Sequence, residues 1–363
     1  MEKIKVAFFI SNLGQGGAEK QFVTLIKELD SSKFEKHLFL YAYQKETFYN
    51  EIFGLSDVKV YTNKLKQTFP LFKILEAGFY LRRNIKKGQF DIVCSTLFMN
   101  NLFVRLFAPK QFKKKCIANV RTSFRLYNRY LLLLEKLQIK NSNLVFNSKK
   151  ALEDFKNIIP SKYHNQMHSI YNGFEVPSDF ISNNKYTFGC LGRTNVEKNF
   201  LQAISVFNSI QNQISSSNLI LQGSKGNQHN QIQQVVTTSS KITIKDANPD
   251  VDIFFSEIKI LIVPSLLEGC PNVLFEGLLR KKMCIISQGA NTDNFIVNLE
   301  NGLVYDGSDE GLEIAMKKAI DIIDTEDGNN IIAAGYKYAK DNFSVNSMIN
   351  KYQELFLKIY EKN

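Results

Sequence analysis

Short apolar runs alternate with longer amphipathic stretches along the whole chain. The first apolar runs predict β-strands at Lys5–Ile10, His37–Tyr43, Asp91–Cys94, Cys116–Val120 and Leu144–Asn147. Later runs predict strands at Tyr186–Leu191, Leu219–Gln222, Lys241–Ile244, Ile260–Val263 and Cys284–Ser287. The stretches between them predict helices, among them Ala18–Leu29, Leu71–Lys86, Phe200–Gln211 and Asn272–Arg280. Strands that alternate with helices are typical of parallel, doubly wound sheets. We therefore expect an α/β protein with two Rossmann-like domains of about five strands each.

One stretch, Asn172–Lys185, is rich in Asn, Ser, Gly and Pro and is the best candidate for an interdomain linker. It divides the chain into an N-terminal domain, 1–174, and a C-terminal domain, 175–344. The remaining residues, 345–363, include an amphipathic segment at Val345–Tyr360 that predicts a helix. We expect this helix to pack back toward the N-terminal domain. Two open sheets facing a cleft would bind ligands beyond the carboxyl ends of their strands.

The 363 residues carry a net charge of +11, and this charge is unevenly distributed. Residues 1–175 hold 29 Lys and Arg against 14 Asp and Glu, whereas the rest of the chain holds 17 against 21. A basic half implies a polyanionic partner, such as an anionic membrane, a nucleic acid or a phosphorylated substrate. Five cysteines without close pairs and four histidines without ligand spacing argue against a disulfide framework and a metal site.

The first apolar stretch, Val6–Ile10, is shorter than the ~7–15 residues of a signal-peptide core. No apolar run approaches the ~20 residues that span a bilayer. We therefore read the start of the chain as a strand and expect a cytoplasmic protein.

A glycine-rich loop follows the first strand and precedes a helix. Gly16 and Gly17 let the backbone approach a ligand closely, and the helix N-terminus favours an anion. A dinucleotide fingerprint does not fit, because Glu19 stands at the position of its third glycine. A P-loop does not fit either, because Glu19-Lys20-Gln21 stands where that motif requires Gly-Lys-Ser/Thr. The loop is either a generic site for a phosphate or sugar or a plain tight turn.

Two cations follow the strand that ends near Leu191. Arg193 offers a planar fork suited to phosphate oxygens, and Lys198 offers a mobile point charge. Together they could neutralise a diphosphate, although a solvated loop with ordinary surface charges would look the same.

The strongest signal is the segment after Val263, where a loop leads into a helix. Gly269 permits close approach of the backbone, and Pro271 suits the first position of a helix. The backbone N–H groups of Asn272 and Val273 are unpaired at a helix start and can cradle an anion.

Two carboxylates flank this predicted anion site. Glu276 shares a helix face with Asn272 and Val273 and leans back toward the loop, where it could accept from two neighbouring ribose hydroxyls. Glu268 lies in the loop itself and could accept from hydroxyls of a second sugar. A diphosphate cradle between two hydroxyl-binding carboxylates has the shape of a nucleotide-sugar site.

The segment EGCPNVLFE, with Glu268 and Glu276 in E-x7-E spacing, resembles the signature of retaining nucleotide-sugar glycosyltransferases of family four. The segments GGAEK, GRTNVEKN and LENGLVYDGSDEGL are also similar to that family, in the same order. The resemblance implies a GT-B fold and transfer of a sugar from a nucleoside-diphosphate sugar with retention of configuration. It also implies that no bound metal or other cofactor is needed.

The resemblance assigns roles to individual residues. Arg193 and Lys198 would bind the diphosphate and stabilise the leaving group. Glu268 would bind the hydroxyls of the donor sugar. These three residues form the expected catalytic set. Glu276 would hold the ribose. Further donor contacts are expected from Gly16, Gly17, Gly269, Cys270, Pro271, Asn272 and Val273.

Three positions depart from the family pattern. Cys270 replaces a residue that is often aromatic, but its contact is expected through the backbone. Lys245-Asp246-Ala247 stands where a glycine-containing turn is usual, which leaves the nucleobase open, with UDP favoured. Arg121 stands near the place of a cleft histidine and is either a contact to donor phosphate or acceptor or an ordinary exposed arginine.

Aromatic residues are interleaved with cations at 69–87, 110–115 and 121–129, a mixture that suits a membrane interface. We therefore expect peripheral association with the anionic inner face of the cell membrane, or else a solvated basic face. The expected acceptor is a glycan or a polyisoprenoid-diphosphate-linked glycan in the assembly of capsule, O-antigen or exopolysaccharide. No nucleic-acid motif is present.

Three other classes of function remain open from the sequence. A sugar-nucleotide epimerase on the same fold would convert the donor without an acceptor. A glycoside hydrolase would use Glu268 and Glu276 as its carboxylate pair. A non-catalytic protein would bind membranes or polyanions and turn over nothing.

Overall fold

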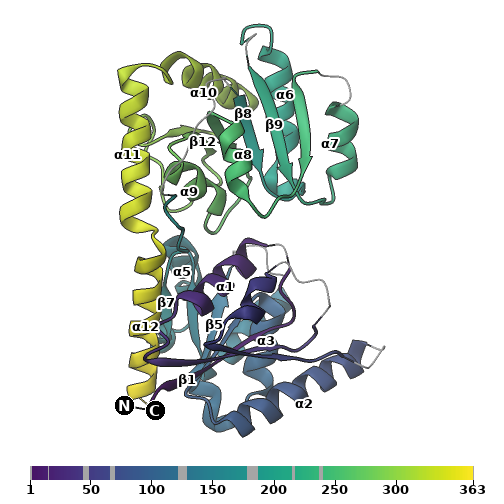
Figure 1. The fold of residues 1–363 in the computed structure, drawn as a ribbon, viewed down its shortest axis with the longest axis vertical. Helices are drawn as coiled ribbons and strands as arrows, with labels where there is room; N and C mark the ends of the chain where they lie inside the picture. The colour runs from purple at the N-terminus through teal and green to yellow at the C-terminus, as the bar shows by residue number, and fades with distance from the viewer. Residues whose placement is uncertain are drawn as a thin grey trace. The chain divides into compact units, whose positions relative to one another are not determined.

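The chain forms two compact units, each built on one parallel sheet (Figure 1). The computed structural model describes residues 2–14, 16–43, 49–65, 70–121, 129–177, 187–214, 217–236 and 240–362. Unit 1 comprises Met1–Gly173 together with Val345–Asn363, and unit 2 comprises Phe174–Ser344. The sequence-based boundary lies one residue later, between residues 174 and 175. Residues 178–185 of the expected linker lie outside the described residues.

Unit 1 has a seven-stranded sheet in the order β3-β2-β1-β4-β5-β6-β7. Its strands are β1 (Ile4–Ile10), β2 (Phe34–Leu40), β3 (Val58–Thr62), β4 (Ile92–Thr96), β5 (Cys116–Val120), β6 (Asn143–Phe146) and β7 (Met167–Ser169). Its helices are α1 (Gly17–Glu28), α2 (Pro70–Gly88), α3 (Phe98–Phe107), α4 (Arg129–Gln138), α5 (Lys149–Lys156) and α12 (Val345–Glu361). Apolar residues of α1 and α12 pack in one core with β1, and those of α2 and α3 pack in another.

Unit 2 has a six-stranded sheet in the order β10-β9-β8-β11-β12-β13. Its strands are β8 (Thr187–Leu191), β9 (Asn218–Gly223), β10 (Ile242–Asp246), β11 (Ile260–Val263), β12 (Met283–Ser287) and β13 (Leu303–Tyr305). Its helices are α6 (Phe200–Ile210), α7 (His229–Val236), α8 (Val251–Glu257), α9 (Asn272–Leu279), α10 (Asp309–Ile322) and α11 (Glu326–Asn342). Helices α6 and α10 share the core on one face of the sheet.

The prediction of about five strands per domain is wrong, because the sheets have seven and six strands. The missed strands β3, β7 and β13 lie at sheet edges and have only five, three and three residues. Short edge strands bury little apolar surface, so their hydrophobic pattern is weak. The bounds expected for β5 and β11 agree with the structure. Tyr186 of the strand expected at 186–191 lies outside the described residues.

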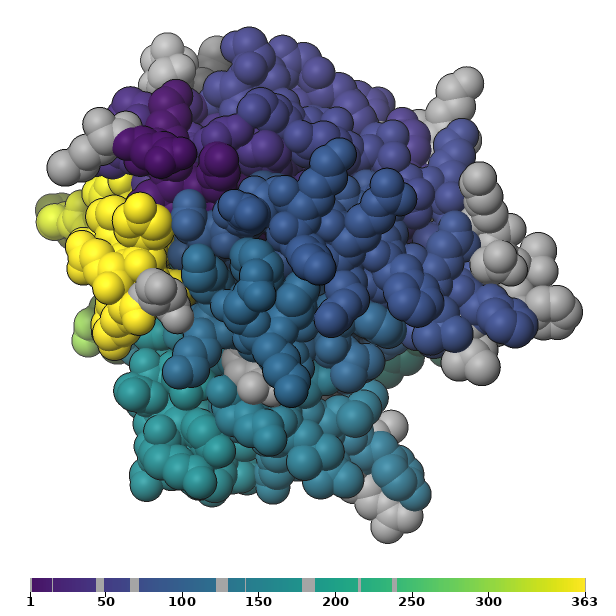
Figure 2. All heavy atoms as spheres, turned by 90° about the horizontal axis from the view of Figure 1, so that it is seen from below, coloured from purple at the N-terminus to yellow at the C-terminus, as the bar shows by residue number. Residues whose placement is uncertain are grey.

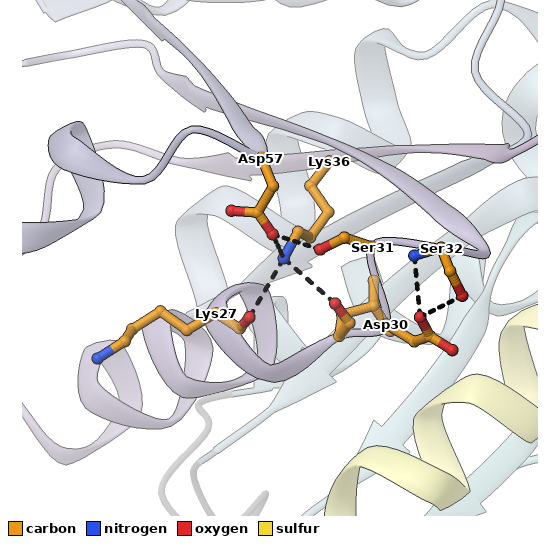
Figure 3. A network of polar contacts seen from close by, with 7 residues as sticks. Lys27, Asp30, Ser31, Ser32, Lys36 and Asp57 are labelled. Carbon is orange, nitrogen blue, oxygen red and sulfur yellow. Dashed lines mark hydrogen bonds and ion pairs between the residues drawn. The ribbon is translucent and has the colours of Figure 1, made fainter.

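The second strand begins three residues earlier than predicted, at Phe34, and includes the charged residues Glu35 and Lys36. Lys36 is fully buried, which its charge did not suggest. Its Nζ donates to the backbone oxygens of Lys27 and Leu29 at 3.2 Å each and pairs with Asp57 at 2.6 Å (Figure 3). The ammonium therefore caps the C-terminus of α1, where the helix dipole favours a cation.

The Lys36–Asp57 pair predicts a pH-dependent contribution to stability. Lys36, with help from Ser31, holds the pKa of Asp57 below its usual value of 3.8. The carboxylate therefore stabilises unit 1 fully above pH 3.8, and this contribution is lost as the pH falls through the lower folded-state pKa. Asp57→Asn should cost about 1–2 kcal/mol at neutral pH, less than for a fully buried pair because Asp57 is partly exposed.

The measurement is the free energy of unfolding in urea across the acidic range. The difference between wild type and Asp57→Asn should shrink as the pH falls. Asp30→Asn is the matched control, because Asp30 accepts hydrogen bonds from Ser32 that an amide oxygen can also accept, and its ion pair with Lys33 lies at the solvent-exposed surface. An equal loss in both variants would contradict a special role of the Lys36 pair.

Candidate functional site

The strand order of unit 2 reverses between β8 and β11, which pair at Ile260–Phe188 and Leu261–Gly189. Strand β9 lies on the other side of β8, and β12 lies on the other side of β11. The loop after β8 leads to α6, and the loop after β11 leads to α9. Because parallel strands end at the same edge, both loops leave from neighbouring points, where open α/β sheets usually bind ligands. The candidate residues of unit 2 lie on these two loops and on the first turns of α9.

The loop after β8 is held in place by the loop after β9. Gly223 lies so close to this loop that an added Cβ would overlap the backbone oxygen of Gly192. Thr194 donates its N–H to the Ser224 oxygen at 3.1 Å, and its hydroxyl accepts from Gly226 N–H at 2.8 Å. The loop that carries Arg193 is therefore fixed on one side by backbone contacts, while Arg193 itself is exposed.

Two asparagines continue this junction. The Asn195 side chain accepts from Asn227 N–H, and the Asn227 side chain accepts from Val196 N–H, each at 3.1 Å. Asn199 then adopts a left-handed conformation, with φ at 53°, before α6 begins at Phe200. Asparagine tolerates this conformation better than most residues. The turn formed by Val196–Lys198 thus precedes α6 with Lys198 at its end.

The structure brings Lys198 and Glu268 together. Lys198 Nζ and Glu268 Oε1 form an ion pair, with the two side chains 26% and 15% exposed. Leu266 N–H also donates to the Glu197 oxygen at 2.9 Å, which joins the two loops through the backbone. The ion pair is shielded on most sides but keeps an opening to solvent, so a ligand could reach both groups.

Helix α9 begins four residues after Glu268 in the chain. Asn272 and Val273 are its first two residues and are partly exposed, whereas Glu276 is buried. The expectation that Pro271 occupies the first helical position is wrong, because Pro271 is the cap residue before it. Its φ of −76° and ψ of 86° lie outside the helical region, as is usual for a cap.

Close packing on the sheet fixes the position of α9. A Cβ added to Gly277 would lie 2.6 Å from Leu261 Cδ2, so glycine lets the helix approach the strand without displacing the Leu261 side chain. The neighbouring loop is also tied, since Ser287 Oγ donates to the Ser265 oxygen at 2.5 Å. Cys270, next to Pro271, is buried.

The remaining expected site residues lie in unit 1. Gly16 and Gly17 stand at the start of α1, and the Glu19 carboxylate lies where a Cβ on Gly16 would be. Arg121 donates to Asn172 Oδ1 at 2.5 Å and to Tyr352 Oη at 3.3 Å. Their roles toward a donor or acceptor stay predictions.

Sequence reasoning missed the residues that hold the site rather than face it. Thr194, Gly223 and Gly226 form the junction behind Arg193, yet they stand far apart in the chain. The glycines after Gln222 were a detectable signal, because a strand that ends in glycine often marks a close backbone approach.

No group of three or more His, Cys, Asp and Glu residues suited to a metal occurs in the described part of the chain. None of the helices searched there is long and apolar enough to cross a membrane.

The junction behind Arg193 predicts that Gly223→Ala is strongly destabilising. The added methyl must displace the Gly192 carbonyl, at a cost of at least about 2 kcal/mol in the free energy of unfolding. Amide hydrogen exchange should show lost protection at Gly192 and Thr194, which donate across this junction. Gly54→Ala is the control, since a Cβ there meets nothing within 4 Å, and its effect should stay within about 0.5 kcal/mol. Unchanged exchange in the Gly223 variant would contradict the tight junction.

Comparison with known proteins gives consistent matches over both units. Residues 15–176 match the family model Glycosyltransferase Family 4, and residues 174–338 match Glycosyl transferases group 1. A search of curated proteins finds no match.

Solved structures of similar fold cover nearly the whole chain. Anabaena HepE in complex with UDP and glucose is 14% identical, with a TM-score of 0.81 over 98% of this chain and 100% of that one. A glycosyltransferase from Rickettsia africae is 17% identical, with a TM-score of 0.83 over 100% of both chains. WaaG, a glycosyltransferase involved in lipopolysaccharide biosynthesis, is 14% identical, with a TM-score of 0.74 over 97% of this chain and 99% of that one. With two family models spanning residues 15–338 and this shared architecture, the chain belongs to the glycosyltransferases of the GT-B fold.

Proposed function

We propose that the protein is a retaining glycosyltransferase that uses a nucleoside-diphosphate sugar, with UDP as the favoured nucleotide. The observation that carries this proposal is the Lys198–Glu268 pair at the point of strand reversal, next in the chain to the first turn of α9. A cation for a diphosphate and a carboxylate for sugar hydroxyls are thereby neighbours. A nucleotide-sugar presents these two chemistries side by side.

Negative charge develops on the diphosphate as it leaves. Arg193 on the exposed side of its loop and Lys198 at the end of the Val196–Lys198 turn would receive that charge. The N–H groups of Asn272 and Val273 at the start of α9 would add hydrogen bonds, with Gly269, Cys270 and Pro271 shaping the loop. Groups fixed before the reaction stabilise such charge well, because they need no reorganisation.

Donor binding has to divide the existing ion pair. The diphosphate would take Lys198, which frees the Glu268 carboxylate to accept from hydroxyls of the sugar. Glu276, buried on the first turns of α9, would accept from the two ribose hydroxyls. A carboxylate in a buried position makes strong, charge-assisted hydrogen bonds, so it fixes the nucleoside.

The reaction exchanges one bond at the anomeric carbon. The bond to the diphosphate oxygen breaks, an acceptor hydroxyl bonds to the same face, and its proton leaves with the diphosphate. In other enzymes a divalent metal neutralises the negative charge on the leaving diphosphate. Here we propose that this is done by Arg193, Lys198 and the start of α9, so that the reaction is independent of a metal.

The acceptor we propose is a glycan or a polyisoprenoid-diphosphate-linked glycan on the route to a bacterial surface polysaccharide. WaaG acts in lipopolysaccharide biosynthesis and HepE binds UDP and glucose, which supports this direction. An acceptor held in a membrane requires the enzyme to work at the cytoplasmic membrane face, and the basic unit 1 is the part suited to that. Arg121, Gly16 and Gly17 are the unit 1 residues proposed to contact acceptor or donor.

The donor site predicts selective stabilisation by one nucleotide without Mg²⁺. At a concentration about 100-fold above Kd, UDP should add about 2.7 kcal/mol to stability and raise the melting temperature by roughly 5–10 °C. Glu276→Gln should weaken UDP binding by about tenfold or more, because charged hydrogen bonds to the ribose are lost. Glu300→Gln, at an exposed site in unit 2, is the control. The proposal fails if UDP, GDP, ADP and CMP all leave the melting temperature unchanged.

Transfer itself depends on the two cations. Lys198→Ala and Arg193→Ala should each lower kcat by about 10²–10³ with radiolabelled UDP-sugar and a lipid-linked acceptor. Lys317→Ala removes a cation of α10 that pairs with Glu313 and should keep full activity. Activity in EDTA should equal activity in Mg²⁺. Epimerised donor without transfer product, or hydrolysis of aryl glycosides that is insensitive to Lys198→Ala, would replace the transferase assignment.

A further inference from the structure

Helix α4 turns an apolar stripe toward solvent. Tyr130, Leu133, Leu134 and Leu137 are 63%, 54%, 38% and 60% exposed. Their spacing of three, four and seven residues puts them on one face of the helix. In a helix that covers a sheet, such a stripe normally faces the core. Here the stripe lies on the outer surface instead.

The inner side of α4 carries a charge. Glu135 is 2% exposed, and both of its carboxylate oxygens accept from Arg105 of α3, at 2.6 and 2.8 Å. Arg105 is 1% exposed and also donates through Nε to the Asn101 oxygen at 3.0 Å. Rotating α4 to bury its leucines would strip Arg105 of this partner inside the protein, which is costly. The ion pair therefore fixes the orientation of the helix and the exposure of the stripe.

Exposed apolar side chains also occur on the neighbouring helices, as α4 contacts α3 and α3 contacts α2. Met99 and Leu106 of α3 are 48% and 54% exposed, and Phe72 and Phe79 of α2 are 54% and 67% exposed. Segments in the blue range of the colour bar, which includes these helices, form much of the face seen in Figure 2. Exposed apolar patches of this kind mark interaction surfaces.

The same stretch holds the whole excess charge of the protein. Residues 70–140 contain 15 Lys and Arg against 3 Asp and Glu, and the rest of the chain is close to neutral. One of the three acids, Glu135, is neutralised in the interior. The exposed cations described here are Lys73, Arg82, Arg83, Lys86, Lys87, Lys110, Lys114, Lys136 and Lys140. An anionic partner with an apolar interior fits both properties.

We propose that α4 lies in the interface of an anionic lipid bilayer, with Leu133, Leu134 and Leu137 inserted and the surrounding cations on the headgroups. Burial of apolar side chains and attraction to anionic lipids add together in such helices. A second copy of this chain would bring two strongly basic surfaces together, and this repulsion argues against self-association. The proposal deepens the membrane-face acceptor proposed above, whereas donor binding by unit 2 does not depend on it.

The first test is sedimentation of the full chain with vesicles of phosphatidylglycerol or of phosphatidylcholine alone. We expect sedimentation with the anionic vesicles, weakened by salt. Leu133→Gln/Leu137→Gln should raise the lipid concentration for half-binding by about tenfold or more. Ile253→Gln/Ile314→Gln, at residues of unit 2 that are 47% and 61% exposed, removes equal apolar surface elsewhere and should change nothing.

The chain contains no tryptophan, which allows a second and independent readout. In L133W the single indole should shift its emission to the blue on anionic vesicles and be quenched by brominated acyl chains. In I314W the emission should stay unchanged. These spectra measure insertion, so attachment by charge alone would leave both variants alike and would overturn the placement of α4.

Two further measurements separate the explanations of a failure. A normal melting-temperature rise with UDP in the Leu133/Leu137 variant shows that it is folded and that the donor site is independent. Analytical ultracentrifugation without lipid tests the competing occupant. A wild-type dimer that the Leu133/Leu137 variant converts to a monomer would overturn the membrane proposal, as would absence of sedimentation with every vesicle.

Discussion

The reversal of strand order between β8 and β11 is the constraint on which the candidate site depends. Two neighbouring parallel strands end at one edge, but their chains continue to different helices, α6 and α9. The space between the diverging loops is thus created by topology before any side chain is chosen. The sequence determines which side chains lie in that space: Lys198 from one loop and Glu268 from the other. Chemistry at this edge follows from the sheet, and its specificity follows from the loops.

The loops themselves are held by backbone contacts rather than by large side chains. Gly223 allows contact with the Gly192 carbonyl, and Gly277 allows α9 to lie directly on β11. Such contacts leave little freedom to the elements that carry Lys198 and Glu276. Between these fixed loops, the Lys198–Glu268 pair compensates both charged groups.

The hydrophobic pattern was sufficient for the two α/β domains and for the bounds of β5 and β11, because buried parallel strands are continuous apolar runs. It failed at β3, β7 and β13, where edge position and short length remove that signal. The motif residues of both loops were identifiable because glycine and charged residues follow a predicted strand in each, and in the second loop a proline precedes the helix. The contact between Lys198 and Glu268 was not, since it joins residues of two loops that follow different strands, and only the strand order makes those loops neighbours. The prediction for Pro271 was wrong by one position, because the cap residue is defined by its backbone dihedral angles and not by its residue type.

A polar residue type did not reliably indicate an exposed position in unit 1. Lys36 is buried because the end of α1 and Asp57 offer it acceptors, and Glu135 is buried because Arg105 offers it donors. Each buried charge fixes the orientation of the element that carries it, since leaving a charged group unpaired in the interior would cost more than exposing apolar surface. In β2 the consequence is a strand that begins earlier than its apolar residues suggest. In α4 the consequence is larger, because the helix face left for solvent is the leucine stripe. An ion pair in the core can thus determine what a protein presents on its surface.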